Sequence, residues 1–331
     1  MKHTLKKSIL LILTLALLLP LAVSCAKKPN SELEIKVYAL NGTTALGLAQ
    51  MIDAAKNDSD TMNYDISLHA AADAVTGPIL SGECAIAALP TNVAVKLYHK
   101  SEGKIQLLAL NTLGVLYLLQ TPDESISSLA DLKGKTVYLP GAGSNPEYIT
   151  AALLSKAGLQ VGTDVILDTT TYSSPDALQA AMIEGKATLA VLPEPKVSVT
   201  TTQKQDITVA LDLTAEWEAV NGENTLVQGC LVVNTAFAKE HPAEIKKFLE
   251  DYKTSVEFIK AGSDEAINMI VDAGILPKAA IAKKALPKCN LCYFAGEEMK
   301  VVMNPFCEAI FAQSPASITK MPDSSFYYVA K

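Results

Sequence analysis

The chain contains no arginine, so all 28 of its basic residues are lysines. Arginine supplies the planar, two-pronged cation with which proteins most often grip a carboxylate. Without it, a bound anion has to be held by backbone N–H groups, hydroxyls, side-chain amides or lysine. Neutral or zwitterionic ligands fit this composition best, and sulfonates held by N–H groups and hydroxyls stay open.

Aromatic residues are also scarce, at 6% of the chain with a single tryptophan, Trp217. Clefts that bind sugars usually stack pyranose rings on aromatic side chains. Carbohydrate is therefore a disfavoured ligand class.

The common catalytic signatures are missing as well. The sequence has no H-E-x-x-H, no G-x-S-x-G and no pair of carboxylates placed for acid–base catalysis. None of its four histidines lies beside a plausible nucleophile; they are His3, His69, His99 and His241. We therefore expect a binding protein without a cofactor, and not an enzyme.

Long hydrophobic runs are absent too, because the longest spans only Ile9 to Leu19, with Thr14 interrupting it. This run is too short to cross a bilayer of roughly 30 Å, and its basic flank predicts an export signal over residues 1–24. The segment that ends at Cys25, LAVSC, resembles the lipobox of bacterial lipoproteins. The resemblance implies a lipid on Cys25 and a tether over residues 25–32; the alternative is that Cys25 is an ordinary residue of the leader.

The net charge is negative, at −7 for the whole chain. Loss of residues 1–24, which hold three lysines and no acidic residue, makes it more negative still. Nucleic-acid surfaces need clustered positive charge, so we expect no nucleic-acid partner.

The cysteines give a weak signal only. Cys289 and Cys292 form a C-x-x-C, but no second ligand pair accompanies them, so we expect no metal site. The βαβ context of a redox pair is also missing. Buried free thiols are the first interpretation, and a disulfide joining Cys292 to either Cys289 or Cys307 is the second.

Short strands alternate with amphipathic helices through the first third of the chain, a rhythm that predicts an α/β fold with mostly parallel sheets. The expected strands are 35–40, 64–68, 85–89 and 105–111, and the expected helices are 44–56, 73–80 and 92–100. A chain of this length also exceeds what one core usually supports, which favours two lobes.

An internal repeat supports two similar lobes. GECAIAALP at 82–90 matches GKATLAVLP at 185–193, and Asp73-Ala74 aligns with Asp176-Ala177 at the same offset. Apolar passages near 113–120 and 224–231 predict two strands that cross between the lobes. The expected boundaries are 1–24 for the signal peptide, 33–115 with 230–331 for lobe one, and 116–229 for lobe two.

Everything after Asn234 is predicted to be helical and to pack back on the first lobe. The expected helices are 242–260, 264–273, 278–286 and 297–313.

The candidate site lies where strands end. In parallel α/β sheets, ligands gather at the carboxyl ends of strands, beside the unpaired N–H groups of helix N-termini. The stretch 141–145, GAGSN, follows a strand and precedes a helix that Pro146 opens, so it could hold a polar or anionic head group or be only a helix cap. Glu147 in the first turn weakens the attraction for a fully charged anion.

Equivalent strand ends carry the other candidates. Glu194, between two prolines, is the carboxylate that could accept a hydrogen bond from a ligand amine, although it could equally be a solvated turn residue. The candidate ligand-binding residues are Asn41, Thr43, Thr44, Thr91, Asn92, Asn111, Thr112, Gly143, Ser144, Asn145, Tyr172, Ser173 and Glu194.

Several segments carry a family resemblance. DLKGKTVYLPGAGSNPEYITAALLSKAGL, AAMIEGKATLAVLPEP, GCLVVNTAFAKEHP and MPDSSFYY are similar to the extracellular solute-binding proteins of ATP-driven importers. They resemble the branch with nitrate, sulfonate and taurine receptors and binders of thiamine-pyrimidine precursors, over nearly all of residues 33–328.

The resemblance implies a two-lobed periplasmic-binding-protein fold of type II, with two similar lobes joined by two crossing strands. It implies a monomer, lipid-anchored to the outer face of the cell membrane, that delivers a heterocyclic precursor or sulfonate-like solute to an ABC permease and its ATPase. The alternatives are a ligand sensor of the same fold and an exported pyrimidine- or cofactor-related enzyme that depends on His69 or a cysteine.

Overall fold

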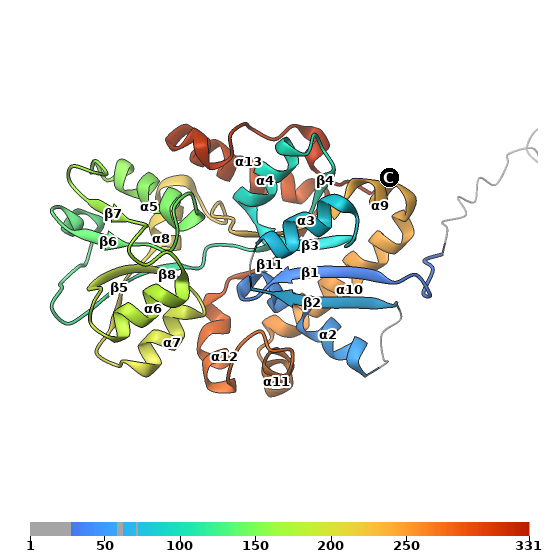
Figure 1. The fold of residues 1–331 in the computed structure, drawn as a ribbon, viewed down its shortest axis with the longest axis horizontal. Coiled ribbons are helices and arrows are strands. Elements are labelled where there is room, and N and C mark those ends of the chain that lie inside the picture. Colours follow the sequence, from blue (N-terminus) through green and yellow to red (C-terminus); the bar gives the residue numbers. More distant parts are fainter. Residues whose placement is uncertain (1–27, 58–61, 71, 331) are drawn as a thin grey trace, which may run out of the picture.

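Two β-sheets, each covered by helices, form two lobes side by side along the long axis of the molecule (Figure 1). The computed structural model describes residues 28–57, 62–70 and 72–330. The predicted signal peptide and Cys25 lie outside these residues. We call the lobe with the six-stranded sheet the first lobe and the lobe with the five-stranded sheet the second lobe.

The sheet of the first lobe has the strand order β11-β4-β10-β3-β1-β2. Its strands are β1 (Ile35–Leu40), β2 (Tyr64–His69), β3 (Ile86–Pro90), β4 (Ile105–Thr112), β10 (Gly229–Asn234) and β11 (Leu291–Ala295). β1 is parallel to β2 and β3, whereas β10 runs antiparallel to both β3 and β4. Every residue of β10 is buried, as its unbroken apolar run and central place require.

The sheet of the second lobe has the order β7-β6-β8-β5-β9. Its strands are β5 (Leu116–Gln120), β6 (Thr136–Tyr138), β7 (Ile166–Asp168), β8 (Leu189–Pro193) and β9 (Thr208–Asp212). Here β5 runs antiparallel to β8 and β9, in the place that β10 takes between β3 and β4. The repeated sequence segments supply β3 and β8, which are equivalent strands. The predicted fold class, α/β with two similar lobes, is confirmed.

Two short passages connect the lobes. The first runs from β4 to β5 through residues 113–115, and the second enters β10 from the second lobe. Gln228 ties them together, because its N–H donates to Thr112 O at 3.0 Å and its side-chain Oε1 accepts from Val115 N at 2.6 Å. The predicted lobe boundaries remain a proposal.

The helices of the first lobe are α2 (Ala49–Lys56), α3 (Asp73–Ser81), α4 (Thr91–Lys100), α9 (Thr235–Glu240), α10 (Pro242–Lys260), α11 (Asp264–Asp272), α12 (Ala279–Ala285) and α13 (Gly296–Gln313). Those of the second lobe are α5 (Asn145–Lys156), α6 (Pro175–Ile183), α7 (Lys196–Gln203) and α8 (Leu213–Asn221). Short 3-10 helices are η1 (Thr43–Leu48), η2 (Leu129–Leu132), η3 (Leu286–Lys288), η4 (Pro315–Ser317) and η5 (Ser324–Phe326). Within the described ranges, none of the helices combines the length and apolarity needed to span a membrane.

The largest apolar cluster contains residues of both lobes. Trp217 of α8 and Phe306 of α13 meet in it, with ring centres 6.0 Å apart. Two further clusters fill the other face of the first sheet and the other face of the second. The lobes are therefore in apolar contact along α8 and α13 as well as through the crossing strands.

Two local predictions need correction. The stretch after Asn234 is not wholly helical, because Leu291–Ala295 forms β11 and pairs antiparallel with β4. The five residues were missed because their partner strand lies far away in the sequence. The first predicted helix, expected from Thr44, begins instead as the 3-10 helix η1 and becomes α-helical only at Ala49.

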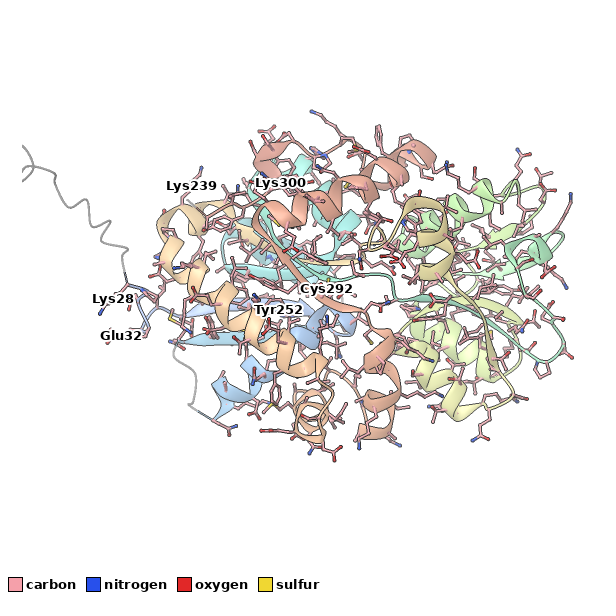
Figure 2. All side chains as sticks on the ribbon, turned by 180° about the vertical axis from the view of Figure 1, so that it is seen from behind. Lys28, Glu32, Lys239, Tyr252, Cys292 and Lys300 are labelled. Carbon is pink, nitrogen blue, oxygen red and sulfur yellow. The ribbon has the colours of Figure 1, made fainter. Side chains whose placement is uncertain are left out.

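The chain enters the fold at the end of the first lobe that faces away from the second lobe. Figure 2 places Lys28 and Glu32 there. The backbone N–H of Asn30 donates to the buried carboxylate of Glu244 at 3.0 Å, which fixes this entry point on α10. Any tether before residue 28 would thus leave from the first lobe.

Candidate functional site

The N-termini of α4 and α5 face each other across the boundary between the lobes. Thr91 and Asn92 form the first turn of α4, and Asn145 is the first residue of α5. The side-chain Nδ2 of Asn145 lies 3.5 Å from Thr91 Oγ1. The structure therefore brings together candidate residues from both lobes at equivalent helix starts.

The contact is buried, and its hydrogen-bonding groups are only partly paired. Thr91 is fully buried and donates its hydroxyl to Val227 O at 2.7 Å. Asn145 is 6% exposed, and its Oδ1 is buried without a hydrogen-bond partner among the described residues. A buried acceptor of this kind costs roughly 1–3 kcal/mol when left unpaired, so it is a natural partner for an N–H group of a ligand.

A second group of candidates lies at the end of β4. The Asn111 side chain donates to Thr44 O at 3.0 Å, and the Thr112 hydroxyl donates to Asn111 Oδ1 at 3.1 Å. Asn111 and Thr112 are buried, whereas Thr43 and Thr44 are half-buried and Asn41 is exposed. Asn111, Thr112 and the Thr44 backbone form one network within the first lobe.

The loop before α5 uses most of its own polar groups. Gly141 and Gly143 have φ values of 77° and 70°, which favour glycine. The Ser144 hydroxyl donates to Pro140 O and Gly141 O at 3.1 and 2.8 Å. The N–H of Gly143 donates to Glu147 Oε2 at 2.5 Å. In this structure the loop therefore binds the carboxylate of Glu147.

Lys96 and Tyr148 make a further contact between α4 and α5. Lys96 Nζ lies 5.3 Å from the centre of the Tyr148 ring, a cation–π contact that joins the lobes. Burial lowers the pKa of Lys96, and the nearby charge of Glu147 opposes that shift. Sequence reasoning missed both residues, although they follow Asn92 and Asn145 by one helical turn.

Two further candidates of the second lobe, Tyr172 and Ser173, lie in the loop after β7. Tyr172 is half-buried and packs on Tyr138, with ring centres 5.3 Å apart, and Ser173 is exposed. A side-chain carbon on Gly141 would lie 3.3 Å from Ser173 O, so the two loops are neighbours.

Glu194 is 2% exposed and accepts two hydrogen bonds from one residue. Ser198 donates its N–H to Oε2 at 3.0 Å and its hydroxyl to Oε1 at 2.9 Å. Burial raises the pKa of Glu194, while the Ser198 hydrogen bonds and the charges of Lys288 and Lys284 oppose the rise. Both carboxylate oxygens thus have partners, and a ligand amine would have to compete with Ser198.

Further side chains bridge the lobes near Glu194. Lys284 of α12 donates to the hydroxyls of Thr201 and Thr202 in α7 at 2.9 and 3.0 Å. The Tyr117 hydroxyl of β5 donates to Lys288 O at 3.3 Å. No sequence motif marks these residues, because they meet only when the lobes are folded and close together.

A cavity of about 570 Å³ lies elsewhere, beside the first crossing passage. It is lined by Leu113, Asn290 and Cys292, among others, and contains none of the candidate ligand residues. Figure 2 places Cys292 of β11 close to Tyr252 of α10. The site at the strand ends is thus distinct from this cavity.

The described cysteines are buried free thiols, namely Cys84, Cys230, Cys289, Cys292 and Cys307. Burial raises the pKa of Cys292 to about 12. No group of three His, Cys, Asp or Glu side chains suited to a metal ion occurs in residues 28–57, 62–70 and 72–330.

The strand orders, the two crossing passages and the facing helix N-termini define a periplasmic-binding-protein fold of type II. The family model described as NMT1/THI5 like matches residues 80–266, and the chain belongs to this family. The predicted resemblance to the nitrate, sulfonate and thiamine-precursor branch is confirmed. No curated protein matches the sequence.

Solved structures with the same fold come from several bacteria. An ABC transporter from Parabacteroides distasonis is 21% identical, with 90% of this chain and 99% of that chain covered and a TM-score of 0.74. The periplasmic aliphatic sulphonate-binding protein SsuA of Escherichia coli is 15% identical over 86% of this chain and 85% of that chain, with a TM-score of 0.66. The alkanesulfonate-binding protein SsuA of Xanthomonas axonopodis pv. citri, bound to MOPS, is 14% identical over 87% and 94%, with a TM-score of 0.65.

Proposed function

We propose that the chain is the solute-binding protein of an ABC importer. It captures a small solute between its lobes, at the starts of α4 and α5, and delivers it to a permease driven by an ATPase. The observation that carries this proposal is the contact of Asn145 with Thr91 beside a buried, unpaired amide oxygen. The names of the structural neighbours, which describe ABC transporter and sulfonate-binding proteins, support it.

The mechanism is hinge closure. The passages around Gly114 and Gln228 act as the hinge, and a ligand that contacts both lobes favours the closed state by its difference in affinity for the two states. The ligand is a heterocyclic precursor or a sulfonate-like compound, bound without chemical change. The candidate residues at the other strand ends, from Asn41 to Glu194, line the same boundary or support it.

The location follows from the N-terminal sequence. A lipid on Cys25 would hold the monomer on the outer face of the cell membrane, with the polar tether leaving the first lobe near Lys28. With the first lobe anchored in this way, the second lobe would be free to move relative to it.

The test is thermal unfolding of the chain from Ala26 onward with a panel of small molecules: thiamine-pyrimidine precursors, alkanesulfonates, taurine, nitrate and amino acids. A ligand at about 100 to 1,000 times its Kd adds roughly 3–4 kcal/mol to the free energy of unfolding and raises Tm by several degrees. A shift with one chemical class supports the proposal. No shift with any compound contradicts it for these ligands.

Neighbouring residues provide the site variants. Asn145→Ala should weaken the affinity for that ligand at least tenfold while the Tm without ligand changes little. Ser144→Ala removes a hydroxyl that bonds only carbonyls of its own loop, so it should lower stability by about 1 kcal/mol and affect the affinity less. Equal affinity in wild type and Asn145→Ala would move the binding site away from α5.

A further inference from the structure

We propose that Glu147 is an internal anion that selects the ligand: it occupies the loop before α5, so the site takes a solute that is neutral or positively charged at this end and rejects anions. This inference rests on the proposed function, because it concerns the same site. It separates this chain from neighbours whose names describe the binding of sulfonates.

The carboxylate of Glu147 contacts the loop before α5. A helix N-terminus attracts anions because its first N–H groups lack partners and carry partial positive charge. In α5 the Ser144 hydroxyl donates to carbonyls instead of accepting from these groups. Glu147 accepts instead from the loop that precedes the helix: its Oε2 lies 2.5 Å from the N of Gly143, the residue before the N-cap Ser144. One N–H group that a sulfonate oxygen could use at this helix start is thus already bound to a carboxylate.

An incoming anion would meet the negative charge of Glu147. Glu147 lies close enough to the first lobe for its charge to raise the pKa of Lys96 in α4, against the effect of burial. Two like charges in close contact repel, and the repulsion is stronger near a protein surface than in bulk water. Lys96 is the neighbouring cation, but it is already engaged with the Tyr148 ring, and burial lowers its pKa.

The unpaired polar group next to the loop, Asn145 Oδ1, is a hydrogen-bond acceptor. Asn145 follows Ser144 directly, is more than nine-tenths buried, and presents an unpaired Oδ1. An amide oxygen accepts hydrogen bonds and donates none. Glu147 and Asn145 Oδ1 are both hydrogen-bond acceptors, so they favour a ligand that carries N–H donors. An alkanesulfonate head group has none.

Capping is the competing explanation for Glu147. A glutamate at the third position of a helix often bonds a backbone N–H near the start of the helix, and this stabilises the helix without any ligand. Glu147→Gln separates the two roles. The glutamine keeps an oxygen that can accept from Gly143 N, but it removes the negative charge. Glu147→Ala removes both the cap and the charge.

The experiment is calorimetric titration of the chain from Ala26 onward with methanesulfonate and with 4-aminopyrimidine, a neutral donor of N–H groups. We expect methanesulfonate to bind Glu147→Gln and Glu147→Ala at least tenfold more tightly than wild type, with a smaller gain at high salt. The matched control is Glu216→Gln, which removes one charge from the first turn of α8 in the same lobe. It should behave as wild type.

The outcomes separate this inference from the proposed function. If wild type binds 4-aminopyrimidine but neither variant gains affinity for methanesulfonate, only the selection by Glu147 is overturned. Tight binding of methanesulfonate by wild type overturns it as well and leaves the solute-binding role standing. If wild type and both variants bind neither probe, both the inference and this reading of the site fail.

Discussion

Gly114 packs directly against Thr214 at the point where the chain first crosses between the lobes. A side-chain carbon on Gly114 would overlap the Thr214 hydroxyl and would lie 2.8 Å from Leu226 Cδ2. Gly114 O also accepts a hydrogen bond from the Asn290 side chain at 2.5 Å. One glycine thus holds together the first crossing passage, α8, the second crossing passage and the segment before β11.

Gly114→Ala should therefore lower the free energy of unfolding by about 1–3 kcal/mol, because the added methyl group overpacks the junction. Urea unfolding measures this loss. Gly77→Ala is the control: Gly77 lies in α3 with open space around its Cα, so alanine there should be neutral or stabilising by about 0.5–1 kcal/mol. Equal effects of the two substitutions would show that the junction tolerates a side chain.

Burial of Glu194 predicts a pH-dependent stability. Burial raises the pKa of Glu194 in the folded state. The protonated side chain therefore contributes stability that is fully present at pH values below the pKa in the unfolded chain, about 4.3. This contribution is lost as the pH rises through the pKa of the folded state. Glu194→Gln removes the dependence. Its stability relative to wild type should increase from pH 4 to pH 7, as urea unfolding at both values measures. The control is Glu184→Gln, at an exposed residue that pairs with Lys186. The prediction is contradicted if the difference in unfolding free energy between Glu194→Gln and wild type is the same at pH 4 and pH 7.

Lys284 should affect the spacing of the lobes more than the stability of the chain. Its hydrogen bonds to Thr201 and Thr202 join α12 to α7, but the side chain is exposed, so Lys284→Ala should cost less than about 1 kcal/mol. The radius of gyration from X-ray scattering should increase as the lobes separate. Lys283→Ala breaks only an ion pair with Asp264 inside the first lobe and should leave the radius unchanged. The same increase for both variants would rule out a specific role of Lys284.

The described cysteines should not react in the folded protein. Burial raises the pKa of Cys84, Cys292 and Cys307 to about 12, and the thiolate is the reactive form. We expect Ellman's reagent at pH 8 to titrate these thiols only after addition of denaturant. Rapid reaction of any thiol in the native chain from Ala26 onward would contradict the burial of these side chains.

The regular elements were predictable where hydrophobic periodicity is local. The strand at 35–40 and the helix at 242–260 were predicted with the bounds that the structure shows, and the repeat at β3 and β8 marked equivalent strands. β11 was not predicted, because five residues carry a weak period and their pairing with β4 depends on a partner nearly 180 residues away. Long-range pairing is the part of the fold that a local pattern does not contain.

The candidate site divides in the same way. The helix starts at Thr91 and Asn145 followed from the strand-loop-helix pattern, but their approach across the lobe boundary did not. The roles of Lys96 and Lys284 depend on the angle between the lobes, which no short segment encodes. Glu194 and Ser198 are four residues apart, so the hydrogen bonds between them could have been anticipated from the helix that follows Pro195.

The position of β10 constrains the order in which the chain can fold. β3 and β4 do not pair with each other; β10 lies between them and bonds both. A growing chain therefore cannot join β3 to β4 until residue 234 has been made, by which time all strands of the second sheet are already present, and β11 adds to the first sheet later still. The second lobe, although later in sequence, can therefore complete its sheet first, while the strands of the N-terminal third wait for β10.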